Sequence, residues 1–108
     1  MSKNKVKGKK YFKTISVEVD KKTYQVHFNA FTPMSIIKAN VARSTEENLA
    51  DIGLIIADSL FAGFSDNIKA KTFSELAKGD DLNFVPMIDQ SLAWCINYLM
   101  ELNGIRKK

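Results

Sequence analysis

The last long stretch of the chain, residues 83–102, constrains the fold most, because it carries the most apolar surface at helical spacing. On a wheel of 100° per residue, one apolar stripe contains Phe84, Ile88, Leu92, Cys95, Leu99 and Leu102. A shoulder beside it contains Met87, Trp94 and Tyr98, and the clearly polar face contains Gln90, Asn97 and Glu101. A helix with so narrow a polar sector must be covered from more than one direction, by the rest of the chain or by another copy.

The chain of 108 residues has room for one domain with one core. Its hydrophobic fraction of 45% and charged fraction of 26% suit an enzyme and a binding module equally. No apolar run approaches the roughly 18 to 20 residues that span a bilayer, and no signal-peptide pattern follows the lysine-rich start, so we expect a cytoplasmic protein without membrane contact. The single cysteine, Cys95, lies on the apolar stripe and is expected to be a core residue.

Charge is divided unevenly along the chain. Residues 1–13 and 106–108 carry nine basic residues and no acid, whereas residues 14–105 carry seven basic and twelve acidic residues. The body is therefore acidic, which disfavours a nucleic-acid groove on it, although basic tails can bind phosphate nonspecifically. We expect a flexible basic arm at 1–10, a single domain at 11–105 and a basic tail at 106–108.

Two alternating segments predict a β-hairpin near the start of the domain. Its inward residues are Ile15, Val17, Val19, Tyr24, Val26 and Phe28. With Lys21 and Lys22 at the centre of the turn, Val19 would face Tyr24. A primed two-residue turn prefers Gly or Asn, so a longer or bulged turn around residues 20–23 is expected. Both strands would be edges, open to pairing with another chain.

Capping signals predict the helices that follow. Thr32 and Pro33 begin a helix to about Ala42, with Met34, Ile37 and Val41 on one side. Ser44 to Glu47 has capping-box spacing and would open a second helix to about Ala62. The inner face of this second helix would contain Leu49, Ile52, Ile56 and Leu60, with Gly53 and Ala57 allowing close approach of another backbone.

The remaining segments lead into the final helix. Residues 63–71 are expected to form a loop that carries Phe64 and Ile68 inward, and Thr72 would cap a short helix over 73–78. Asn103-Gly104 would end the final helix. The sequence thus predicts an α+β fold: an N-terminal β-hairpin followed by three to four α-helices, mainly helical, in one domain.

No catalytic, cofactor or metal site is indicated by these patterns. His27 falls on the polar side of the hairpin with Ser16 as its expected cross-strand neighbour, and it has no evident partner acid beyond Glu18. Asp80 and Asp81 are explained by helix capping, and with Asp89 they do not match a calcium loop. Trp94 and Tyr98, four residues apart, are either core or a stacking platform for a base or a protein.

The segment TISVEVDKKTYQVHFNAFTPMSIIKA, followed by an all-helical remainder, resembles the tail assembly chaperones of long-tailed bacteriophages and prophages. The residue-level match lies in the hairpin and in Phe31-Thr32-Pro33, which leads into the following helix. The turn has Lys21 and Lys22 where the family usually has a Gly. The resemblance implies a non-enzymatic protein of the host cytoplasm, absent from the mature virion. It would bind the tape measure protein and self-associate before the tail tube protein polymerises. The tail tube protein is a further candidate partner.

The wide apolar arc of the last long stretch suits a protein that covers apolar helices of other chains, and its candidate partner-binding residues are Met87, Trp94, Tyr98 and Met100. A ribosomal frameshift near the end of the short form occurs in many members, and Lys107-Lys108 is compatible with a slippery codon pair. The alternative function is a small nucleic-acid-binding regulatory protein that uses the basic tails.

Overall fold

The computed structural model describes the backbone of residues 11–107 and the side chains of residues 11–104. Its strands are β1 (Lys13–Val19), β2 (Lys22–Phe28) and β3 (Phe61–Phe64). Its helices are α2 (Pro33–Thr45), α3 (Leu49–Leu60), α4 (Phe73–Ala77), the 3₁₀-helix η1 (Leu82–Phe84) and α5 (Val85–Lys107). The predicted α+β class, with an N-terminal hairpin and a mainly helical remainder in one domain, is confirmed. The basic arm expected at 1–10 lies outside the described residues.

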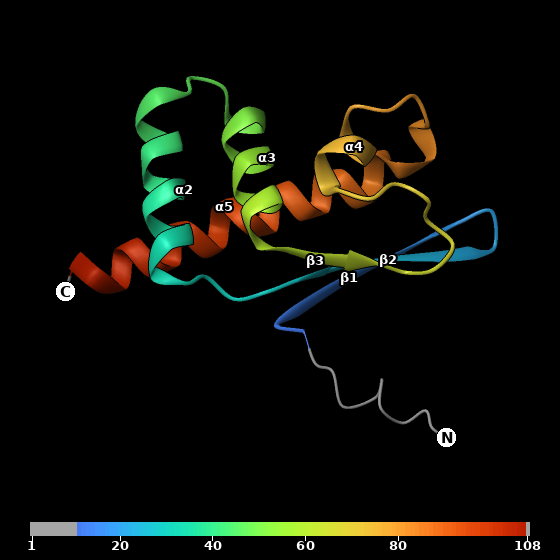
Figure 1. Ribbon diagram of the computed structural model, residues 1–108, viewed down its shortest axis with the longest axis horizontal. Helices are drawn as coiled ribbons and strands as arrows, with labels where there is room; N and C mark the ends of the chain where they lie inside the picture. The colour runs from blue at the N-terminus through green and yellow to red at the C-terminus, as the bar shows by residue number, and fades with distance from the viewer. Residues whose placement is uncertain (1–10, 108) are drawn as a thin grey trace.

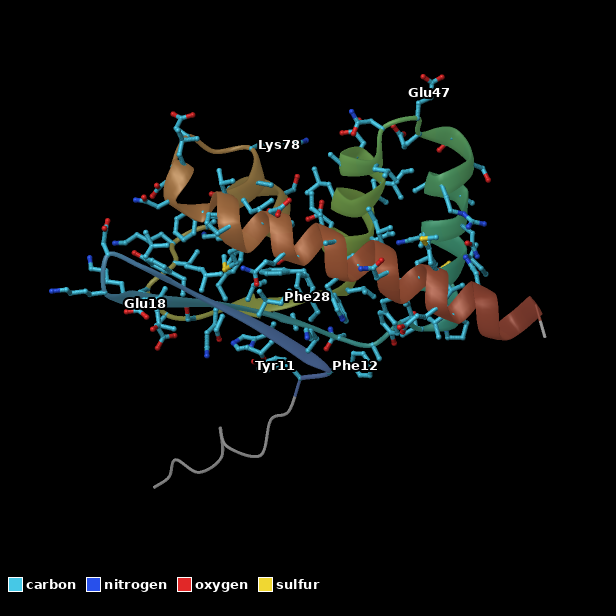
Figure 2. All side chains as sticks on the ribbon, turned by 180° about the vertical axis from the view of Figure 1, so that it is seen from behind. Tyr11, Phe12, Glu18, Phe28, Glu47 and Lys78 are labelled. Carbon is cyan, nitrogen blue, oxygen red and sulfur yellow. The ribbon has the colours of Figure 1, made fainter. Side chains whose placement is uncertain are left out.

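Helix α5 connects the two halves of the molecule. Figure 1 shows the sheet along one side, α2, α3 and α4 on the other, and α5 running lengthwise behind them. Seen from behind, α5 crosses in front of α3, and the strands lie below it in the view (Figure 2). It packs against both α3 and the hairpin strands, so the stretch with the most apolar surface forms the common wall of the core.

The hairpin is present, but its turn is tighter than predicted. The pairs are Val19 with Lys22 and Val17 with Tyr24, so the central turn residues are Asp20 and Lys21. Their φ angles of 52° and 68° are both positive, as in a type I′ turn. The expected register and the longer turn were therefore wrong. Because the register differs by two residues, all the predicted inward side chains still face the core.

A third strand was not predicted. Residues 61–64, expected at the end of a helix and the start of a loop, form β3 and pair with β2. Gly63 lies opposite His27 with φ of 149°, a conformation that favours glycine. In the part of the chain that the structure describes, β2 is therefore central in the sheet, with β1 and β3 at its edges. Ile68, in the segment after β3, is buried as expected.

The predicted cap of α2 is correct, whereas that of α3 is not. The Thr32 hydroxyl accepts a bond from Ser35 N at 3.1 Å, and Ser35 Oγ accepts one from Thr32 N at 2.7 Å. Ser44 instead lies inside α2 and donates to Asn40 O. Asn48 caps α3 by accepting from Ala50 N at 2.7 Å, so the helix begins later than expected. Leu49, predicted on the inner face, is largely exposed because it lies in the first turn, beyond the contact with α5.

The final helix begins and ends differently from the prediction. Residues 82–84 form η1, with Asp81 accepting from Asn83 N, and Pro86 lies in the first turn of α5 as expected. The predicted stop at Asn103-Gly104 was wrong, because α5 continues to Lys107. Thr72 caps the short helix α4 by accepting from Glu75 N at 3.0 Å, as predicted.

Candidate protein-interaction surface

The outer side of α2 carries several exposed large apolar side chains. Met34, Ile37 and Val41 expose between 55% and 59% of their areas to solvent. The inner side of this helix is made of the small residues Ser35, Ala39 and Ala42. Large side chains thus point outward and small ones inward, which is the reverse of an ordinary amphipathic surface helix.

Between α2 and α3 this apolar side deepens into an open groove of about 330 Å³. Its lining consists of Ile37, Lys38, Val41, Ala42, Thr45 and Ile55. Ile55 belongs to α3 and remains 38% exposed. We call these six residues together with Met34 the α2/α3 groove.

Trp94 and Tyr98, two predicted contact residues, are half-buried within an aromatic stack. Their ring centroids lie 5.1 Å apart, and Trp94 lies 5.3 Å from Phe28 in the core. Phe12, which is exposed, stacks on Tyr98 at 5.1 Å from the outer side. The Tyr98 hydroxyl also accepts from Phe31 N at 3.4 Å. Both rings thus serve mainly to hold the hairpin, and the segment that leads into α2, against α5.

The other two predicted contacts lie in opposite environments. Met87 is fully buried and belongs to the core, so its side chain does not reach the surface in this structure. Met100 is exposed on α5, about 120° around the helix axis from Trp94. The four predicted residues therefore do not form one patch.

Among residues 11–107, strand β1 is a regular edge whose outward backbone groups pair with no other strand. Gln25 N donates to Ser65 Oγ and Gln25 O accepts from Ser65 N, so the backbone of Gln25 faces β3. Its partner Ser16 must then direct its own N–H and C=O away from β2, to the open edge of the sheet. By contrast, β3 is four residues long and pairs irregularly with β2. Both features protect an edge strand from pairing with another chain.

His27 lies on the solvent side of the sheet, but it is partly covered. The Tyr11 ring stacks on it at 4.2 Å, and Thr14 Oγ1 lies 2.8 Å from its Nδ1. The cross-strand neighbour is therefore Thr14, and the expectation of Ser16 was wrong because of the register. Desolvation by burial lowers the pKa of His27 from its ordinary 6.5. Among the described residues, no carboxylate is bonded to the ring. His27 therefore has no acidic partner there that would orient it as a catalytic base.

The remaining chemical candidates are dispersed. Within residues 11–107, no three His, Cys, Asp or Glu side chains gather closely enough to hold a metal ion. Cys95 is fully buried as predicted, and burial raises the pKa of its thiol to about 12. In the same part of the chain, no helix has both the length and the apolar character needed to cross a membrane.

The α2/α3 groove was missed by the sequence reasoning, although its signal was present. Met34, Ile37 and Val41 share one side of the predicted helix, and the opposite side carries the small residues of a close helix contact. Comparison with protein-family models, with curated proteins and with solved structures finds no match for this chain.

Proposed function

We propose that this protein is a non-enzymatic assembly chaperone of the phage-tail type. It binds apolar helices of a tape measure protein and self-associates in the host cytoplasm during tail morphogenesis, and it is absent from the mature virion. The α2/α3 groove is the observation that carries this proposal, because it offers outward-facing apolar side chains on two helices that pack together. The family resemblance supplies the identity of the partner.

The open β1 edge supports the self-association part of the proposal. A seven-residue strand without proline offers backbone donors and acceptors to a second chain. Because β1 and the groove lie on different elements, client binding and self-association have separate surfaces available to them.

Co-expression with a candidate tape measure protein tests the proposed function. We expect the chain to keep the tape measure protein soluble and to co-purify with it in a salt-tolerant complex, because apolar contacts are not screened. Absence of a complex, with DNA binding that falls steeply as salt rises and disappears on deletion of residues 1–10, would instead establish the nucleic-acid-binding alternative.

A further inference from the structure

The α2/α3 groove has the dimensions of a site for one helix. Helix α2 has thirteen residues, which at 1.5 Å per residue makes roughly 20 Å. Its exposed apolar residues, Met34, Ile37 and Val41, follow the spacing i, i+3, i+7 and span eight of its thirteen residues. This is the spacing with which one helix packs along another. Ala42 at the floor and Ile55 on the opposite wall leave room for side chains to enter.

One charge is present in the otherwise apolar lining. Lys38 lines the groove, and no other lining residue is ionisable. Its ammonium has no hydrogen-bond or carboxylate partner among residues 11–104. A cation at the edge of an apolar groove favours a ligand that carries a carboxylate beside its apolar stripe.

The small size of the groove favours a single helix over a second folded copy. Stable dimer interfaces draw on roughly 20 to 30 residues from each side. The groove lining contains six residues, and a helix that presents a few anchors matches this number.

From these features we infer that the α2/α3 groove binds one amphipathic helix whose apolar residues fill it and whose flanking carboxylate pairs with Lys38. This inference rests on the proposed function for the identity of the client, and it names the surface and the chemistry of the contact. An acidic amphipathic segment of about three to four turns is the expected ligand.

A synthetic helical peptide tests the groove directly. The probe is a fluorescein-labelled 14-residue peptide with leucines at i, i+3, i+7 and glutamates beside them. Its comparators replace the glutamates with lysines or scramble the order. We expect fluorescence anisotropy to show binding of the acidic peptide to the full chain, about two- to fivefold weaker binding of the lysine peptide, and none of the scrambled one.

Substitutions locate the binding site. Ile37→Asp and Val41→Asp each should weaken binding at least about tenfold, since a carboxylate would be desolvated in an apolar contact. Lys38→Glu should reverse the preference between the acidic and the lysine peptides. Leu82→Asp is the matched control, because Leu82 is an exposed leucine in η1, outside the groove, and its variant should bind as the wild type does. Circular dichroism checks that each variant is folded.

Three results would overturn the inference. One is unchanged peptide binding by folded Ile37→Asp, and another is a peptide preference that Lys38→Glu leaves unaltered. The third is a wild-type dimer in sedimentation that Ile37→Asp converts to monomer without any peptide binding, since the groove would then hold a second copy.

The same variants separate this inference from the proposed function. A tape measure complex that survives Ile37→Asp overturns the groove assignment and leaves the proposed function standing. Peptide binding that requires Ile37 and Lys38, with no tape measure complex, supports the groove and overturns the proposed function alone.

Discussion

Gly53 of α3 lies so close to Leu92 of α5 that a Cβ at position 53 would be 3.1 Å from the Leu92 Cβ. The same Cβ would lie 3.3 Å from the Cδ1 of Ile96. The absence of a side chain at position 53 therefore sets the distance between the two helices that make the most extensive helix contact of the described structure.

Gly53→Leu should lower the free energy of unfolding by about 1 to 3 kcal/mol, because the added side chain overpacks the α3–α5 contact. Urea unfolding measures the change. Gly104→Leu is the matched control, because nothing lies within 4 Å of a Cβ there and α5 would gain up to about 1 kcal/mol in helix propensity. Equal effects at both positions would contradict the close approach.

The hairpin turn carries strain that a substitution can remove. Asp20 and Lys21 both have positive φ, a conformation that costs an ordinary residue about 1 kcal/mol and that Asn-Gly adopts readily. The double variant Asp20→Asn, Lys21→Gly should raise the melting temperature by about 4 °C or more. Lys22→Gly should lower it, because residue 22 lies in β2 and gains only backbone freedom. A higher melting temperature for Lys22→Gly would instead indicate that the turn is centred on Lys21 and Lys22, as the sequence alone suggested.

Proline substitution tests which backbone groups of β1 face the open edge. Ser16→Pro should leave the fold intact, since its N–H points away from β2. Val17→Pro should destabilise the domain by about 3 kcal/mol or more, because the Val17 N–H pairs with β2. Thermal unfolding compares the two variants, and similar losses would contradict the register. If self-association uses this edge, sedimentation of Ser16→Pro should show the monomer.

The environment of His27 predicts a pH effect on stability. Its pKa in the folded state lies below 6.5, so the unfolded chain takes up the proton first as the pH falls. The free energy of unfolding should therefore decrease between about pH 6.5 and the lower folded pKa, and the group should have no effect above this range. In urea titrations at pH 7.5 and 5.0, His27→Gln should lose less stability than the wild type. An identical loss in both proteins would show that His27 does not titrate differently on folding.

Local periodicity was enough to predict which faces are buried, but not how strands align. Two registers of the hairpin, two residues apart, put the same side chains on the core side, and they differ in the turn and in which residues lie opposite one another. Residue preferences disfavour Asp20-Lys21 in a primed turn, yet the tighter turn forms and β2 gains a further partner in β3. Strand β3 has four residues and no clear alternation, so only its tertiary pairing defines it.

The candidate surface was harder to predict than the fold for a related reason. A helical wheel shows that Met34, Ile37 and Val41 share a side, but it does not show which side meets the rest of the protein. The contact is made through Ala39 and Ala42, whose small size lets α2 approach closely. The wide apolar arc of α5, in contrast, is mostly buried against other parts of the chain, as Met87, Cys95 and Leu99 show.

The position of Trp94 in the aromatic stack provides an intrinsic optical probe. It is the chain's single tryptophan, and it bridges Phe28 of the hairpin and Tyr98 of α5. Separation of the hairpin from α5 would expose the indole to water and shift its emission to longer wavelength. Unlabelled protein can therefore report in real time whether these two parts of the molecule stay joined while a client is taken up or released.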